Sequence, residues 1–271
     1  MVIEVLISTM QQPVGDYSLL EKMNIQTNAV VINQCNEVGI QKIIHRGHEV
    51  IWINSNERGL SKSRNLAIQT SSADICVLAD DDEVFVEGYE GIITKGFERN
   101  PNCALIRYMV EGIEDIFKFY PNKEHDIGYI SSMKISSVEV AFKRKDVKDN
   151  NIKFDELIGA GTKYMMGEEN AFSWECLRRK MKMKYIPVII ANLHIGNSSW
   201  FKGYDKDYFI GRGAAFTAMS IPLSKILILQ FAIRRNALYR DQVGILKSIR
   251  LMWYGSKMYM RDREQKRKSL S

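Results

Sequence analysis

Strand-like apolar runs alternate with helical segments through the first hundred residues, and this alternation limits the fold more than any other feature. The runs consist almost entirely of apolar side chains, which is typical of strands buried on both faces. Such strands, separated by helices, predict an α/β fold with a mostly parallel, Rossmann-like sheet flanked by helices. The expected strands are 2–8, 29–33, 49–54 and 75–79, and the expected helices are 17–23 and 61–70, with Ser61 as the N-cap of the second.

The length of 271 residues suits one α/β domain with an appendage, or two small domains. Residues 100–200 have a more mixed pattern, with strands expected at 103–110, 137–142 and 184–191 and a helix at 168–180. After residue 205 basic and apolar residues alternate in a pattern that is compatible with helices. We therefore predict a first domain at 1–205, with halves at 1–100 and 101–205, and a basic, amphipathic helical region at 206–271.

Polar residues stand directly after several of the expected strands. In helix-flanked parallel sheets, ligands bind beyond the carboxyl ends of the strands. We therefore expect a ligand site where these polar residues meet. They are Ser8, Thr9, Asn33, Gln34, Asn54, Asp80, Asp81 and Asp82.

Three aspartates, Asp80, Asp81 and Asp82, follow the apolar strand expected at 75–79. Like charges repel and burial raises the pKa of a carboxyl, so this group needs a neutralising partner. Mg²⁺ or Mn²⁺ would supply one and would add phosphate oxygens from a bound substrate. The alternative is a solvated turn in which one Asp caps the next helix.

Cations stand at the start of the helix expected at 61–70. Helix N-termini favour anions, so Lys62 and Arg64 lie where isolated cations are disfavoured. A bound diphosphate would be attracted by both the helix dipole and these side chains. Alternatively, Arg64 pairs with the aspartates across the edge of the sheet.

A second acidic segment, Glu168-Glu169, follows Gly167 and begins an amphipathic helix. These carboxylates either complement the helix dipole or include a general base that takes a proton from an attacking hydroxyl. His194 follows the apolar strand expected at 184–191 and is either a further metal or phosphate ligand or a structural histidine. Both segments are therefore candidates for a catalytic site.

In this order and spacing, the motifs resemble those of inverting glycosyltransferases of family 2 with the GT-A fold, particularly bacterial enzymes that build capsular polysaccharide or exopolysaccharide. The resemblance covers about residues 2–215. Its marks are the first strand ending in Ser8-Thr9, the segment 59–67, Asp80-Asp81-Asp82 as the Asp-x-Asp motif, the segment 167–172 as the later acidic motif, and His194.

The resemblance implies that residues 1–100 bind a nucleotide-sugar donor, a UDP-sugar by preference, and that 101–205 bind a glycan or a lipid-linked acceptor. Asp80 and Asp82 would hold Mn²⁺ or Mg²⁺, with His194 as a further ligand. Glu169 would deprotonate the acceptor hydroxyl for a single in-line displacement. The other implied donor contacts are Ser8, Thr9, Asn33, Lys62, Arg64, Asp80 and Asp81, and the implied acceptor contacts are Glu168, Gly161 and Trp200.

Two features depart from the family pattern. The segment 33–36 reads Asn-Gln-Cys-Asn where an Asp-rich segment is common, and the base position carries Glu where Asp is common. Two other functions stay open. A sugar-phosphate nucleotidyltransferase would have a glycine-rich loop after the first strand, which is missing here, and a catalytically inactive, membrane-docked partner subunit would not need the acids.

The net charge of +6 is unevenly distributed, because residues from 201 onward include 15 Lys and Arg against five Asp and Glu, a net +10. We expect basic amphipathic helices in this region to bind an anionic membrane surface. The alternative is a helical subdomain packed on the core. No base-reading motif accompanies the charge, so nucleic acid is not an expected partner. The expected apolar face is Ile245, Leu246, Ile249, Met252, Trp253 and Met260, flanked by Lys247, Arg250, Lys257 and Arg261.

The location of the protein is predicted from the cysteines and the N-terminus. Cys35, Cys76, Cys103 and Cys176 are scattered without a Cys-x-x-Cys pair, and the N-terminus lacks the basic region and cleavage site of a secretory signal. Scattered thiols indicate a reducing compartment. We expect a cytoplasmic protein, peripheral at the inner face of the cell membrane.

Overall fold

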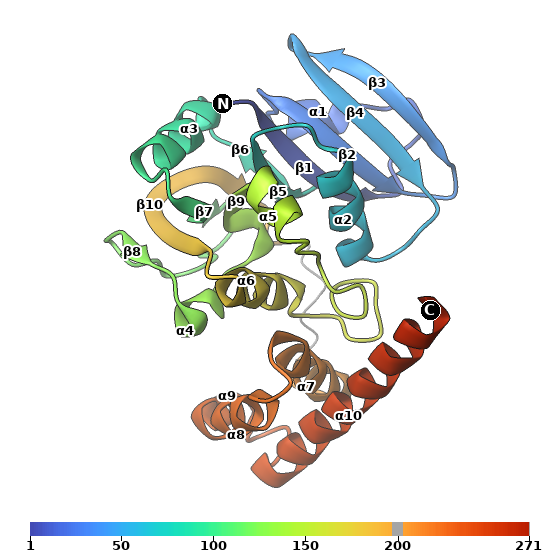
Figure 1. The fold of residues 1–271 in the computed structure, drawn as a ribbon, viewed down its shortest axis with the longest axis vertical. Coiled ribbons are helices and arrows are strands. Elements are labelled where there is room, and N and C mark those ends of the chain that lie inside the picture. Colours follow the sequence, from blue (N-terminus) through green and yellow to red (C-terminus); the bar gives the residue numbers. More distant parts are fainter. Residues whose placement is uncertain (197–202, 271) are drawn as a thin grey trace. The chain divides into compact units, whose positions relative to one another are not determined.

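The computed structural model describes residues 1–196 and 203–270, which divide into two compact units (Figure 1). Unit 1 comprises residues 1–58, 62–153 and 176–198, and unit 2 comprises 59–61, 154–175 and 199–271. The strands are β1 (Ile3–Met10), β2 (Asn28–Gln34), β3 (Gly39–His45), β4 (His48–Ser55), β5 (Ile75–Asp80), β6 (Glu83–Phe85), β7 (Cys103–Gly112), β8 (His125–Asp126), β9 (Val140–Lys143) and β10 (Lys182–Leu193). The helices are α1 (Ser18–Lys22), α2 (Leu60–Thr70), α3 (Tyr89–Arg99), α4 (Tyr129–Ser132), the 3₁₀ turn Ser137–Glu139, α5 (Arg144–Asp149), α6 (Glu168–Arg178), α7 (Lys206–Met219), α8 (Ser224–Arg234), α9 (Asn236–Tyr239) and α10 (Ile245–Leu270).

Unit 1 is built on one sheet with the strand order β3-β4-β2-β1-β5-β9-β7-β10-β6, and β8 pairs with β10. The strands β4, β2, β1 and β5 run parallel, as predicted. The later strands introduce antiparallel pairs, because β9 lies between β5 and β7 and runs against both. The result is a mixed α/β fold whose parallel strands bring their carboxyl ends to one edge.

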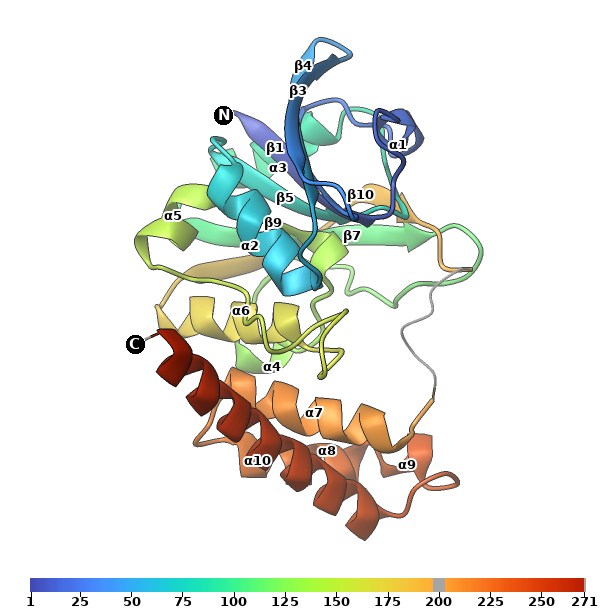
Figure 2. The ribbon, with the colours of Figure 1, turned by 90° about the vertical axis from the view of Figure 1, so that its right-hand side faces the viewer.

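Alternating side chains of β1 serve two different layers. Ile3, Val5 and Ile7 join the core that includes the buried residues of α1 and α3. The intervening residues face α2, where Ser8 Oγ lies 2.8 Å from Ser63 Oγ. Helices therefore cover both faces of the sheet (Figure 2), which is why residues on both faces of the central strand β1 are buried.

Some local predictions were wrong. The helix predicted to be capped by Ser61 begins at Leu60, and the Ser61 hydroxyl donates to the Ile158 carbonyl at 2.8 Å instead of capping. The strand expected at 137–142 starts only at Val140, after a 3₁₀ turn. The hairpin strand β3 was not predicted. Its two-residue turn, Arg46-Gly47, has positive φ angles of 49° and 85°, as hairpin turns require.

Unit 2 contains a helical bundle in which α7, α8 and α10 lie side by side (Figures 1 and 2). Glycines allow α7 and α10 to approach closely: a Cβ on Gly213 would stand 1.9 Å from the Met252 carbonyl oxygen, and one on Gly255 would stand 2.0 Å from that of Ile210. Met252 and Tyr259 are buried on this face of α10. None of the described helices is long and apolar enough to cross a membrane.

The predicted apolar face of α10 is divided by this packing. Met252 is buried, whereas Leu246, Trp253 and Met260 are exposed together with Tyr254. The basic residues Lys247, Arg250, Lys257 and Arg261 are exposed as well. The helix is therefore partly a packed element of the bundle and partly an exposed surface.

Candidate functional site

The carboxyl ends of the parallel strands bring the predicted residues of unit 1 together. In the sheet register Ser8 is opposite Asp80, and Thr9 is opposite Asn33. The Thr9 hydroxyl donates to Asp81 Oδ2 at 2.6 Å. A threonine and an aspartate that are 72 residues apart in sequence thus meet at one edge.

An amide network occupies the neighbouring strand ends. Asn33 Nδ2 donates to Asn54 Oδ1 at 2.9 Å and to the Gln12 carbonyl at 3.0 Å, and Asn33 Oδ1 accepts from the Gln12 backbone N–H at 3.0 Å. Gln12 Nε2 also donates to Thr9 at 2.9 Å. Asn33 is therefore held rigidly beside Thr9 by uncharged groups, in the segment where the family pattern has acids.

The first aspartate of the triplet is paired with the buried arginine of α2. Arg64 Nη2 donates to Asp80 Oδ1 at 3.0 Å, and the Arg64 side chain is only 1% exposed. This is the pairing that the sequence left open as an alternative to a diphosphate contact. Lys62 behaves differently, because its Nζ lies 2.9 Å from Glu57 Oε2 on a more exposed surface.

The third aspartate has one carboxylate oxygen without a hydrogen-bond partner. Asp82 Oδ1 is buried with no hydrogen-bond partner among the described residues. Burial, reinforced by the charges of Asp80 and Asp81, raises the pKa of Asp82 to about 6. The turn leads into β6 and not into a helix, and α3 is preceded by Gly88, so the helix-capping alternative for the aspartates is wrong.

Glu83 lies directly behind the triplet and is fully buried. Its Oε2 accepts from the Asp80 backbone N–H at 3.0 Å, while its Oε1 has no partner among the described residues. Burial and the nearby Asp80 and Asp82 hold the pKa of Glu83 well above its ordinary value. At this edge of the sheet, the carboxyl groups therefore outnumber the cations that pair with them among the described residues.

His194 joins the same edge from β10. Its backbone N–H donates to the Asp82 carbonyl at 3.0 Å, and its Nδ1 lies 2.7 Å from Glu114 Oε1. Glu114 Oε2 accepts from the Ile195 N–H at 2.7 Å, and the hydrogen bonds from His194 and Ile195 lower the pKa of Glu114 to about 2. Because this carboxylate is an acceptor, Nδ1 carries the proton and Nε2 is the nitrogen available to a cation.

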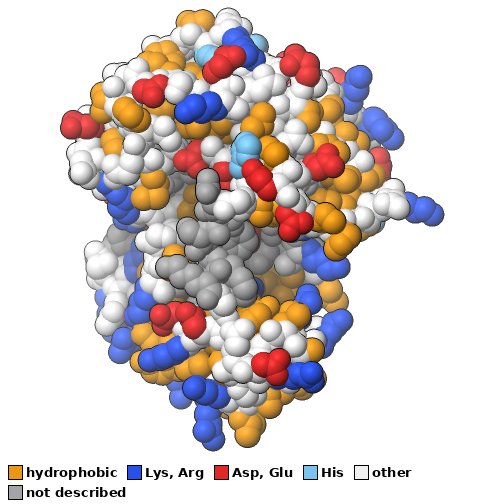
Figure 3. All heavy atoms as spheres, turned by 180° about the vertical axis from the view of Figure 1, so that it is seen from behind, with side chains coloured by type: hydrophobic (Ala, Val, Ile, Leu, Met, Phe, Trp, Pro, Cys, Tyr) orange, Lys and Arg blue, Asp and Glu red, His pale blue; other side chains and the backbone are white. Residues whose placement is uncertain are grey.

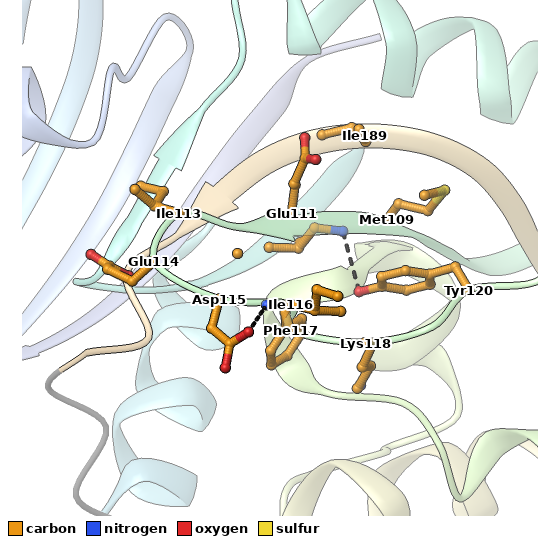
Figure 4. A pocket seen from close by; sticks show the side chains of 12 residues that line it. Met109, Glu111, Ile113, Glu114, Asp115, Ile116, Phe117, Lys118, Tyr120 and Ile189 are labelled. Atoms are coloured by element: carbon orange, nitrogen blue, oxygen red, sulfur yellow. Dashed lines mark hydrogen bonds between the residues drawn. The ribbon is translucent and has the colours of Figure 1, made fainter.

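A pocket of about 350 Å³ lies beside this pair in unit 1, between the loop after β7 and β10 (Figure 4). Glu111 points from β7 toward the strand that carries Ile189. Pro187 lies within the register shift between Tyr185 and Ile189, where β10 bends. The pocket is lined by acidic, apolar and aromatic side chains, including Glu111, Glu114, Asp115, Phe117, Tyr120 and Ile189.

The loop beside the pocket is anchored by a buried ion-pair network. Glu139 accepts from Arg107 Nε at 2.8 Å, from Lys118 Nζ at 2.9 Å and from the Tyr120 hydroxyl at 2.6 Å. The Arg107 guanidinium also lies 5.3 Å from the ring centroids of both Tyr120 and Tyr185. These contacts fix the loop that carries Glu114.

The second acidic segment belongs to unit 2. Gly167 has a φ of 87°, and α6 begins immediately after it, with Glu168 buried and Glu169 half-buried. Glu168 packs over Gly159, where a Cβ would stand 2.9 Å from the Glu168 carboxyl carbon. Gly161 is exposed, with a φ of 79°. Trp200, the other predicted acceptor contact, lies outside the described residues.

Three residues of this site were missed by sequence reasoning. Gln12 and Glu114 carry no motif, and Glu114 stands 80 residues from the histidine that it contacts. Glu83 is adjacent to the triplet, but its burial depends on β6 pairing with β10.

No group of three or more His, Cys, Asp and Glu side chains in the described part of the chain is arranged to hold a metal ion by itself.

No protein-family model matches this chain, and no curated protein matches its sequence. Solved structures do match its fold. S. aureus TarS 1–349 in complex with UDP-GlcNAc is similar with a TM-score of 0.60 at 12% identity, over 89% of this chain and 74% of that one. The complex of TarS 1–349 with UDP gives a TM-score of 0.58 at 12% identity, over 90% and 75%. A crystal structure of S. aureus TarS gives a TM-score of 0.57 at 11% identity, over 88% of this chain and 44% of that one. This chain therefore shares the fold of TarS.

Proposed function

We propose that this protein is an inverting glycosyltransferase that moves a sugar from a nucleotide-sugar donor to an acceptor hydroxyl. The observation that carries the proposal is the polar edge of Ser8, Thr9, Asn33 and the aspartate triplet in a fold shared with a UDP-GlcNAc complex. A UDP-sugar is the donor that this likeness favours, since the two TarS 1–349 structures are complexes with UDP-GlcNAc and UDP.

The donor would lie along the carboxyl ends of β1, β2 and β5. The amides of Asn33 and Asn54 offer hydrogen-bond groups to a base or a ribose without adding charge. Arg64 would act by holding Asp80 in place, and Lys62 would be the cation closer to the diphosphate, because it is more exposed. In this proposal Asp81 positions Thr9 through their hydrogen bond.

The acidic edge fits a divalent cation that is completed by the substrate. Asp82 offers a buried oxygen without a hydrogen-bond partner, and a cation there would offset the repulsion from Asp80 and Asp81. Mg²⁺ and Mn²⁺ are held by one or two carboxylates together with substrate phosphates. Asp82 would be the main protein ligand. Asp80 is a weaker candidate, because its carboxylate already accepts a hydrogen bond from Arg64. His194 would be a further ligand through Nε2, with its ring oriented by the hydrogen bond to Glu114. Such a cation would offset the charge on the departing diphosphate.

In the proposed reaction, Glu169 in unit 2 takes the proton of the acceptor hydroxyl. The acceptor oxygen forms a bond to the anomeric carbon as the bond from that carbon to the diphosphate breaks, with inversion. An activated donor needs no protonation of its leaving group, so one carboxylate base is enough. Glu168 and Gly161 are proposed to contact the acceptor from the loop 154–167 and the start of α6.

We further propose a glycan or lipid-linked acceptor in the synthesis of capsular or other surface polysaccharide, at the cytoplasmic face of the membrane. The basis is the family resemblance together with the basic helices of unit 2. A sugar-phosphate nucleotidyltransferase and an inactive partner subunit are the competing functions.

The test is thermal stabilisation by UDP, dTDP and GDP, each with and without Mn²⁺. At a ligand concentration of 100 Kd, stabilisation is about 2.7 kcal/mol, which corresponds to a rise in Tm of about 5–10 °C for a protein of this size. We expect this rise with UDP and Mn²⁺, its loss in Asp82→Ala, and its retention in the surface control Asp149→Ala. An absence of any shift in the folded wild-type protein would favour the inactive partner.

A further inference from the structure

Helix α8 exposes a row of apolar side chains. Ile226, Leu229 and Ile233 are 62%, 40% and 66% exposed, and their spacing places them on one side of the helix. The opposite side carries Ser224, Leu227, Ile228 and Ala232, all buried in the bundle. Helix α8 therefore has a second apolar face, which is exposed and not buried within unit 2.

The segments that flank α8 in the sequence carry further exposed apolar side chains. Ile221 and Leu223 precede the helix and are exposed, and Leu238 in α9 is exposed after it. Large exposed apolar patches in folded proteins mark sites of interaction with membranes or proteins. We call Ile221, Leu223, Ile226, Leu229, Ile233 and Leu238 the α8 surface.

Cations predominate around the α8 surface, although Arg240 lies 4.0 Å from the carboxylate of the exposed Asp241. Residues 208–240 contain no Asp or Glu, and Lys225, Arg234, Arg235 and Arg240 are all exposed there. Helix α10 adds exposed Trp253 and Tyr254 beside Arg250 and Lys257. On the face that Figure 3 shows, blue Lys and Arg side chains lie among orange hydrophobic ones in the lower part of the picture, with fewer red Asp and Glu side chains between them.

We propose that the α8 surface docks on an anionic lipid surface, with Ile226, Leu229 and Ile233 entering the boundary between headgroups and acyl chains. Apolar residues rimmed by Lys and Arg, with interfacial Trp and Tyr nearby, are what such a boundary binds. A second copy of this chain would bring the same cations against each other, which disfavours a symmetric dimer on this surface. The sequence predicted membrane binding by the basic helices of residues 206–271 in general, and α8 is the helix that makes the apolar contact in this proposal.

This inference goes beyond the proposed transfer reaction and does not depend on it. The experiment uses the full chain without nucleotide and measures co-sedimentation with phosphatidylcholine vesicles that contain either no anionic lipid or about one-third phosphatidylglycerol. We expect binding to the anionic vesicles that weakens as salt rises, because the attraction of Lys and Arg to anionic lipids is screened.

Two matched triple variants locate the contact. Ile226→Gln/Leu229→Gln/Ile233→Gln keeps helix-favouring residues and should lower the partition coefficient at least tenfold. Val38→Thr/Ile40→Thr/Ile44→Thr removes apolar side chains that are 70–72% exposed in unit 1 and should leave it unchanged. Equal loss in both variants, or no binding by the wild type, would overturn the proposal. So would sedimentation of the free wild type as a dimer that the glutamine variant converts to a monomer.

Discussion

Arg64 of α2 donates a hydrogen bond to Asp80 at the end of β5, with 3.0 Å between the guanidinium nitrogen and the carboxylate oxygen. The arginine is almost completely buried, whereas the aspartate reaches the polar edge of the sheet. The buried guanidinium of Arg64 thus fixes the position of the Asp80 carboxylate, the first of the three aspartates. The pair links the helix that follows the parallel strand β4 to the strand that carries the acids.

Replacing Arg64 with Gln should lower the free energy of unfolding by about 3 kcal/mol, because removing one partner of a buried pair leaves the other inadequately compensated. Denaturation by urea measures the loss. Lys145→Gln is the control, since Lys145 pairs with Asp149 on the surface and exposed pairs contribute about 0–1 kcal/mol. The double variant Arg64→Gln/Asp80→Asn should cost less than the sum of its two single changes, and strict additivity would contradict the pairing.

Glu139 should make stability depend on pH. Burial raises its pKa, but Lys118 and Arg107 outweigh burial, so the pKa lies below the ordinary value of 4.5. The folded state then binds fewer protons than the unfolded state, and the contribution of Glu139 is complete above pH 4.5 and lost as pH falls through the folded pKa. Glu139→Gln should therefore cost about 3 kcal/mol at pH 7 and progressively less below pH 4.5.

Urea denaturation of both proteins across this pH range checks the sign of the effect. Glu124→Gln is the control, because Glu124 makes only a long contact of 3.8 Å with exposed Arg99. A difference between wild type and Glu139→Gln that grows as the pH falls would contradict the argument.

Much of the polar edge could be predicted because it depends on local patterns. Once β1, β2 and β5 are identified from their apolar runs, the rule for parallel strands places Ser8, Asn33 and Asp80 at the same edge. No knowledge of long-range packing is needed. The same reasoning did not predict the hairpin strand β3, because β3 is exposed and carries no continuous apolar run.

The rest of the site depends on contacts that the sequence pattern does not encode. Glu114 reaches His194 only because β7 and β10 pair in parallel and end together. Whether Arg64 contacts an anion or Asp80 is decided by the direction of its side chain from α2. Similarly, the α10 face predicted from helical periodicity is divided by close packing against α7, which two glycines permit.

Gly159 should tolerate alanine much less well than Gly15. Both have positive φ, 104° and 83°, so each substitution carries a similar backbone cost of about 1 kcal/mol. A Cβ on Gly15 meets nothing within 4 Å, whereas one on Gly159 meets the Glu168 carboxyl group. Overpacking of this kind adds about 1–3 kcal/mol, which lowers Tm by a further 2–12 °C or so. Equal Tm values for Gly159→Ala and Gly15→Ala would show that Glu168 does not pack over the loop.

In the proposed reaction, Glu169→Gln should abolish sugar transfer and leave donor binding intact. The amide keeps the shape of the side chain but cannot take the proton of the attacking hydroxyl. Loss of a general base typically lowers the rate by about 10²–10⁴-fold. The measurement is UDP release from UDP-GlcNAc, together with the Tm rise given by UDP and Mn²⁺. Glu156→Gln is the matched control in the same unit, since the Glu156 carboxylate accepts from Lys266 Nζ at 2.7 Å. If Glu169→Gln lost the UDP-dependent rise as well, Glu169 would belong to the donor site and could not be assigned as the base.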